Sequence, residues 1–164
     1  MSAPVFEPPD RTITWGRADG CVTLETRLVL VRPIADVFEF FADAGNLERI
    51  TPPWLRFRIL TPRPIAMCAG ARIDYRLRLH GLPVTWRSEI TEWAPPHRFV
   101  DEQRRGPYRV WIHEHDFAER AGGTEVHDRV RYAVPGGALV DRLFVRRDVG
   151  RIFEYRARAL GALI

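Results

Sequence analysis

The chain has 164 residues, of which 46% are hydrophobic and 28% charged, a size and composition typical of one soluble domain. Its net charge is only +4, and all 25 basic residues are arginines spread along the chain, which argues against a clustered nucleic-acid-binding face and excludes Schiff-base lysine chemistry. No apolar run reaches the roughly 18 residues of a membrane span, and neither serine lies in a G-x-S-x-G nucleophile motif.

The first part of the chain predicts an arm ahead of a single domain. Residues 1–19 contain several prolines and little periodicity, so we expect an extended arm, with room for a short strand at 11–15, and a domain over 20–164. The N-terminus has neither the basic nor the apolar part of a secretory signal. Cys21 and Cys68 form no C-x-x-C pair, so we expect a reduced, cytoplasmic protein.

The next segments predict a strand and two short helices. Residues 21–32 alternate as a strand does, and Pro33 then stands where a helix accepts proline. Apolar residues follow at the i, i+3, i+4 and i+7 spacing from Ile34 to Phe41, which predicts one amphipathic helix. Residues 46–50 predict a second helix, ended by the two prolines that follow.

The remaining chain predicts a run of strands and then one long helix. Alternating segments separated by short turns indicate antiparallel strands at 54–60, 72–80, 84–93, 98–104, 110–117 and 124–133. Residues 138–163 indicate a helix in which Gly150 predicts a kink or a close contact. Its expected core residues are Leu139, Leu143, Ile152, Phe153 and Leu160. The order predicts an α+β fold: a seven-stranded antiparallel sheet around the C-terminal helix, with the short helices at one end and a gap beneath the sheet.

The strand at 111–117 carries the most informative residues. Alternation places Trp111, His113, His115 and Phe117 on one face, which has no carboxylate and therefore turns inward. The two imidazoles then lie about 7 Å apart at Cα on a mostly apolar wall. A hairpin turn near 121–122 sets Asp128 opposite His115.

The preceding turn adds two more polar residues to this wall. A pivot near Gly106 and Pro107 places Asp101 near His113 and Gln103 near Trp111. A lone carboxylate on an apolar wall is costly, so we expect Asp128 and His115 to contact each other beside a cavity.

Several local motifs resemble one family. These are Ile50-Thr51-Pro52-Pro53, Gly70 to Tyr75, Trp86 with Ile90, Phe99 to Gln103, Gly106-Pro107-Tyr108 with Trp111-x-His113-x-His115-x-Phe117, and Asp128-x-Val130-x-Tyr132. Together with the element order, they resemble the START-like or SRPBCC superfamily, in its bacterial ligand-binding, cyclase/dehydrase-like branch. The resemblance covers roughly residues 23–160 and implies a helix-grip fold with a hydrophobic cavity. It does not imply one reaction, because this fold serves many functions.

Three interpretations of the polar cluster stay open. It is a satisfied structural network, a polar spot that recognises a ligand in an apolar pocket, or an acid–base or metal site. We expect no cofactor and no metal, because His113 and His115 lack an evident third ligand.

The expected function is binding of a hydrophobic or aromatic molecule, such as a lipid, polyketide or quinone. The alternatives are a cyclase or dehydratase that uses His115 and Asp128, and an interaction module that uses the arginine-bearing helix face. The expected ligand-binding residues are Tyr75, Trp86, Asp101, Gln103, Trp111, His113, His115, Phe117, Asp128 and Tyr132.

Overall fold

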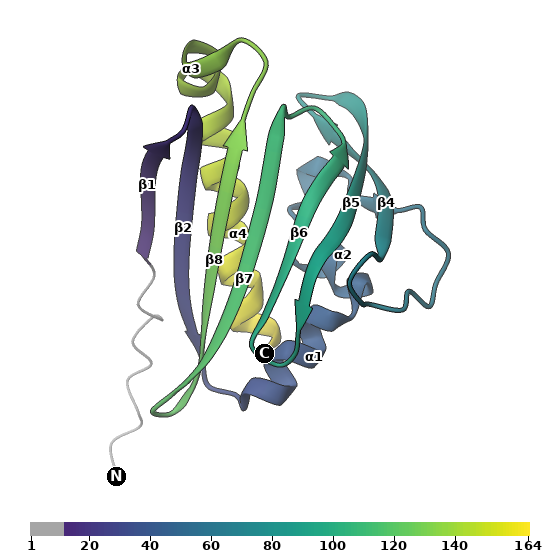
Figure 1. Cartoon of the computed structure of the whole chain (residues 1–164), viewed down its shortest axis with the longest axis vertical. Coiled ribbons are helices and arrows are strands. Elements are labelled where there is room, and N and C mark those ends of the chain that lie inside the picture. Colours follow the sequence, from purple (N-terminus) through teal and green to yellow (C-terminus); the bar gives the residue numbers. More distant parts are fainter. Residues whose placement is uncertain (1–11) are drawn as a thin grey trace.

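The computed structural model describes residues 12–164 as one curved antiparallel sheet with its helices on one face (Figure 1). Eight strands lie in the order β1-β2-β8-β7-β6-β5-β4-β3. The strands are β1 (Thr12–Ala18), β2 (Cys21–Leu30), β3 (Arg58–Ile59), β4 (Arg72–Leu79), β5 (Leu82–Ala94), β6 (Arg98–Arg105), β7 (Val110–Arg120) and β8 (Gly123–Ala133). The fold class is α+β, as the sequence predicts.

The helices follow the predicted order. Between β2 and β4 lie α1 (Ile34–Ala42), η1 (Ala44–Asn46), α2 (Leu47–Ile50) and the 3₁₀ turn η2 (Pro53–Leu55). At the C-terminus α3 (Gly137–Val140), the π-helical turn η3 (Asp141–Val145) and α4 (Arg146–Leu163) follow one another without a break. No helix within residues 12–164 is long and apolar enough to cross a membrane.

Two of the helix contacts that build the core lie on the inner face of the sheet. Val149 and Phe153 of α4 pack against Val130 of β8 and its neighbours on β2. Phe38 of α1 packs edge-on against Phe117 of β7, with ring centroids 5.4 Å apart. In both helices these residues recur at helical spacing, so the apolar faces predicted from the sequence are the faces that pack against the sheet.

The long hairpin of β7 and β8 sets the register at the centre of the sheet. Gly122 in its turn has a φ of 86°, in the left-handed region that glycine enters without steric cost. His115 consequently pairs with Asp128, and His113 pairs with Val130. On the other side of β7, Asp101 pairs with His113. All three pairings confirm the predicted register.

The sheet has one more strand than the seven predicted, and it lies where the sequence left room for a short strand at 11–15. Residues 12–18, which the prediction places in the extended arm, form β1 and pair along their full length with β2. The arm itself stays a prediction, because residues 1–11 lie outside the described residues. The strand predicted at 54–60 is shorter: only Arg58–Ile59 pairs with β4, because the prolines before it favour the turn η2.

The start of the C-terminal helix differs from the prediction. The apolar pattern predicts Leu139 and Leu143 in the core, but they are 66% and 57% exposed. Figure 1 shows the reason: α3 stands above the ends of β2 and β8, beyond the sheet that would cover it. Gly150 makes the close contact that the sequence allows, since a Cβ there would lie 3.4 Å from the ring of Trp15 on β1.

Candidate functional site: a cavity bordered by a histidine–carboxylate cluster

A cavity of about 180 Å³ lies between the inner face of β4 to β7, the α2 region and α4. Most of its wall is apolar or aromatic. Two groups of polar side chains interrupt it: Asp43, Asn46 and Thr51 near α2, and Ser88, Asp101, His113, His115 and Arg156 between the sheet and α4. An apolar wall with a few convergent polar groups is typical of small-molecule sites.

Aromatic side chains form the wall on β4, β5 and β7. Tyr75 stacks on Trp86 with centroids 5.8 Å apart, and Trp111 stands nearly perpendicular to Trp86 at 5.3 Å. Trp86 Nε1 donates to Ser88 Oγ at 3.2 Å, and the Tyr75 hydroxyl lies 3.2 Å from the same oxygen. Burial raises the pKa of Tyr75 well above its ordinary value, and the charge of Asp101 raises it further, so the hydroxyl stays neutral.

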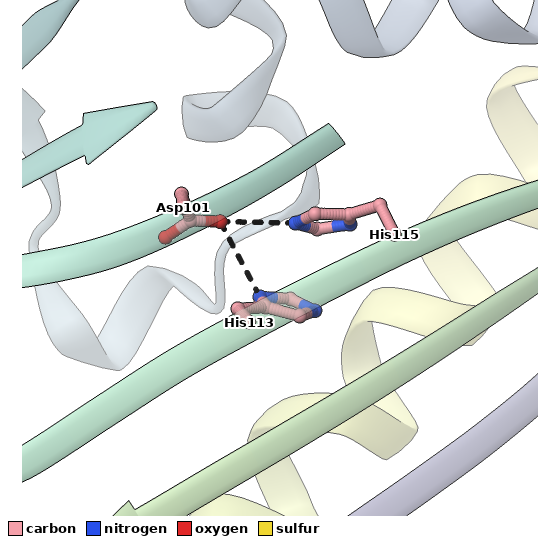
Figure 2. Close-up of side chains that lie close together, drawn as sticks. All are labelled: Asp101, His113 and His115. Atoms are coloured by element: carbon pink, nitrogen blue, oxygen red, sulfur yellow. Dashed lines mark hydrogen bonds and ion pairs between the residues drawn. The ribbon is translucent and has the colours of Figure 1, made fainter. Parts of the chain in front are cut away.

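The polar cluster is built on adjacent strands (Figure 2). Asp101 points from β6 toward the two imidazoles of β7. His115 Nε2 donates to Asp101 Oδ2 at 3.0 Å, and His113 Nδ1 lies 3.8 Å from the same oxygen. Ser88 Oγ donates to the other oxygen, Oδ1, at 3.4 Å. The centroids of the two imidazole rings lie 3.7 Å apart, and the ring planes are tilted by 35°.

Asp128 lies on the other side of the imidazoles. Its Oδ1 is 2.7 Å from His115 Nδ1 and 3.3 Å from His113 Nε2, and its Oδ2 is 3.6 Å from Arg156 Nε. The contact between His115 and Asp128 is therefore confirmed. However, these three nitrogens and Asp128 Oδ1 are buried without an aligned hydrogen bond. Charge attraction, rather than hydrogen-bond geometry, holds this part of the cluster together.

The cluster shifts the pKa values of its two histidines in opposite directions. Burial lowers the pKa of His113, and repulsion from His115 lowers it further. Burial also acts to lower the pKa of His115, but the charge of Asp128 and the bond to Asp101 outweigh it, so this pKa is raised. The arrangement favours a charged His115 beside a neutral His113.

Both carboxylates stay ionised. Burial acts to raise the pKa of Asp128, yet Arg156 and His115 hold it well below its usual range. For Asp101, burial is likewise outweighed by the bond from His115 and by the positive charges around it, so its pKa is lowered. Two carboxylates then face two cations, His115 and Arg156, which is the balance a buried cluster requires.

The structure brings six of the ten predicted ligand-binding residues to the cavity wall. These are Tyr75, Trp86, Asp101, Trp111, His113 and His115. The other four lie elsewhere. Asp128 lies behind the imidazoles, Gln103 bonds the backbone of Tyr108 at 2.7 Å, Phe117 packs under α1, and Tyr132 bonds Asp141 at 2.6 Å. Alternation along a strand predicts which face a residue takes, but it does not specify the position of that residue along the sheet.

Arg156 is the main site residue that sequence reasoning missed. Its guanidinium lies 5.4 Å from the ring of Phe41 and faces Asp128. A signal was present: Arg156 follows Phe153 by three residues and precedes Leu160 by four, so all three share the buried face of α4.

Comparisons with known proteins agree with this architecture. Residues 30–160 match the family described as polyketide cyclase / dehydrase and lipid transport, which confirms the resemblance to the SRPBCC superfamily. No curated protein matches the chain.

Solved structures with low sequence identity show the same fold. Protein Ms6760 from Mycobacterium smegmatis has a TM-score of 0.68 at 19% identity, covering 93% of this chain and 97% of that one. Protein CV1439 from Chromobacterium violaceum has a TM-score of 0.68 at 16% identity, covering 87% and 96%. The major latex-like protein 151 from Panax ginseng has a TM-score of 0.63 at 11% identity, covering 85% and 95%.

Proposed function

The chain belongs to the polyketide cyclase/dehydrase and lipid-transport family, and from this premise we propose that it binds a hydrophobic or aromatic small molecule between the sheet and α4. The observation that carries the proposal is the aromatic cavity with a charged cluster on its wall. Apolar surface supplies affinity and a few polar groups fix orientation in sites of this kind.

The dimensions of the cavity narrow the ligand. Its volume of about 180 Å³ suits one or two rings or a short chain, because a cavity of about 150 Å³ holds a single benzene molecule. A long-chain lipid needs more room than this. Arg156 lines the cavity and its guanidinium has several N–H donors, so a ligand that carries a carbonyl or another oxygen acceptor would match it. A small quinone or aromatic ketone combines these properties.

Native mass spectrometry of the purified protein, followed by calorimetric titration with 1,4-naphthoquinone, tests the proposal. Leu79 lines the cavity, and Arg78 precedes it on the exposed face of β4. We expect Leu79→Trp to fill the cavity and weaken binding at least tenfold, whereas Arg78→Trp leaves binding unchanged. Equal loss in both variants, or binding that survives Leu79→Trp, would place the ligand elsewhere.

The role of the cluster in recognition is tested by His115→Gln. Unchanged stability with lost ligand assigns His115 to recognition. Lost stability with retained ligand assigns the cluster to structure alone.

An acid–base function is the second candidate, favoured by one observation. His115 lies at the cavity wall between two carboxylates, and its raised pKa keeps a proton available near neutral pH. A poly-β-ketone thioester analogue should then cyclise or dehydrate in the presence of the protein but not of His115→Gln. The interaction module, the absence of nucleic-acid binding and the cytoplasmic location stay predictions.

A further inference from the structure

We propose that Asp101, His113 and His115 bind a divalent transition-metal ion whose open coordination positions face the cavity. The sequence predicts Asp101 near His113 without assigning it as a ligand, and the pairing of β6 with β7 brings it to both histidines. This proposal is independent of the organic ligand, because it concerns only side chains of the chain itself.

The three ligand atoms have suitable spacing. Asp101 Oδ2 lies 3.0 Å from His115 Nε2 and 3.8 Å from His113 Nδ1, and the three residues offer ligand atoms within 4.8 Å of one another. Nitrogen and oxygen ligands about 2.0–2.1 Å from a tetrahedral zinc ion are about 3.4 Å apart. Small side-chain movements therefore convert this arrangement into one face of a tetrahedron (Figure 2).

Each ligand is also supported from behind, as metal ligands usually are. The ring nitrogens that face away from Asp101, His115 Nδ1 and His113 Nε2, both approach Asp128 Oδ1. The second oxygen of Asp101 accepts from Ser88. Imidazoles that bind a metal typically direct their other nitrogen to a carboxylate, and ligating carboxylates are themselves hydrogen-bonded.

Charge and access favour a cation at this position. Asp101 and Asp128 carry two negative charges, and Arg156, which faces Asp128, carries one positive charge. Binding of the ion displaces the proton of His115, which leaves one net negative charge on the cluster for the divalent ion to offset. Because all three ligands line the cavity, the fourth position opens toward it, as in zinc sites that keep a place for water or substrate.

The combination of ligands selects the kind of ion. Imidazole nitrogen suits zinc, iron, nickel and copper, whereas magnesium and calcium require oxygen ligands. Two histidines and one carboxylate are the ligand set of zinc hydrolases and of non-haem iron enzymes. Zinc ion alone is therefore the probe, with cobalt as its spectroscopic substitute and magnesium as the negative control.

The test uses chelator-treated full-length protein without added organic ligand. Calorimetry should give one zinc ion per chain and no magnesium binding, and cobalt should produce visible bands without thiolate charge transfer from Cys21 or Cys68. In histidine ring NMR, zinc should shift the signals of two of the five histidines, which requires no variant.

Variants then assign the ligands. We expect Asp101→Asn and His113→Gln to weaken zinc binding at least tenfold, and Asp128→Asn to weaken it 10- to 100-fold. His127→Gln is the matched control, because His127 pairs with Glu25 across β2 and β8 and lies outside the cavity. Absence of zinc binding at millimolar concentration, perturbation of other histidines, or binding unaffected by Asp101→Asn overturns the proposal. None of these outcomes would affect the proposed function, because binding of the organic ligand is measured on metal-free protein.

Discussion

Within residues 12–164 two aspartates, Asp128 and Asp141, are fully buried, and they differ in how their carboxylates are satisfied. Asp141, in the π-helical turn, is 1% exposed and accepts a bond from the Tyr132 hydroxyl at 2.6 Å and one from Arg17 at 3.2 Å. Asp128 is buried just as deeply, but its Oδ1 has short contacts without aligned hydrogen bonds. Asp141 lies away from the cavity, whereas the partners of Asp128 line it.

This difference separates a structural acid from a functional candidate. Buried polar groups that only stabilise a fold are nearly always hydrogen-bonded, as Asp141 is. A buried group without aligned partners calls for another explanation, such as a binding or catalytic role. The cluster around Asp128 is therefore the place where function is expected.

The largest loss of stability should come from Asp128→Ala. It leaves His115 and Arg156 buried with one anion fewer, and breaking a buried charge pair typically costs about 3–5 kcal/mol of unfolding free energy. Denaturant unfolding measures this cost. Asp116→Ala on the exposed face of β7 is the control, and losing its ion pair with Arg98 should cost less than about 1 kcal/mol. A loss for Asp128→Ala no larger than that of the control would contradict the comparison.

Asp141→Asn should have an intermediate effect. The amide accepts a weaker bond from Tyr132 and loses the charge that Arg17 faces, so we expect a loss of about 1–3 kcal/mol. Zinc and naphthoquinone binding should remain unchanged, because Asp141 does not line the cavity. Loss of either affinity in a folded Asp141→Asn variant would show that the two acids are not distinct in role.

The stability that Asp128 contributes should depend on pH in the acid range. Arg156 and His115 outweigh the effect of burial and hold the pKa of Asp128 well below its ordinary value of about 3.9. Its contribution to stability is therefore complete above that value and is lost as pH falls through the folded pKa, by about 1.4 kcal/mol per pH unit for one proton. The difference in unfolding free energy between wild type and Asp128→Asn should narrow over this window. A constant difference would contradict the assignment.

The two histidines act in opposite directions near pH 6.5. The pKa of His115 is raised, so its stabilising contribution is present below about 6.5 and is lost as pH rises through the folded pKa. The pKa of His113 is lowered, so burying it neutral costs stability as pH falls below about 6.5. The two contributions fall in adjacent pH windows, so stability should rise toward pH 6.5 and decline above it. Denaturant unfolding measured against pH checks this: His113→Gln should remove the rise, and His115→Gln should remove the decline.

The smallest loss of stability should come from Ser88→Ala, which changes the cluster only where Ser88 contacts Asp101 at the cavity wall. Trp86 Nε1 loses its acceptor and Asp101 loses one donor, at a cost of about 1 kcal/mol. Thr85→Ala, on the exposed face of the same strand, is the control. Thermal unfolding compares the two. An effect as large as that of Asp128→Ala would show that the cavity side and the buried side form one inseparable network.

Sequence patterns are sufficient to predict the contact at the centre of this comparison. Alternation along β7 and β8 identifies the inner face, and the glycine turn between them fixes the register, so the pattern alone sets His115 opposite Asp128. The same reasoning brings Asp101 to His113. Local turn chemistry determines pairing between strands that are neighbours in sequence.

Contacts between distant segments are not accessible in this way. The approach of Arg156 to Asp128 depends on where α4 crosses the sheet, which no local pattern specifies. Leu139 and Leu143 follow a helical apolar pattern but extend beyond the sheet, so periodicity alone misplaces them. The full length of strand β1 is missed because weak alternation in a proline-bearing segment is overridden by pairing with β2.

The paired tryptophans of the cavity wall give the protein its own optical reporter. Trp86 and Trp111 lie 5.3 Å apart with their planes at 89°, a separation at which indole transitions couple and produce a near-ultraviolet circular dichroism signal. Because both rings line the cavity, a quinone entering it would quench their emission and alter that coupling. Occupancy of the cavity can thus be followed in the unlabelled chain, against a background from the three other indoles at Trp15, Trp54 and Trp93.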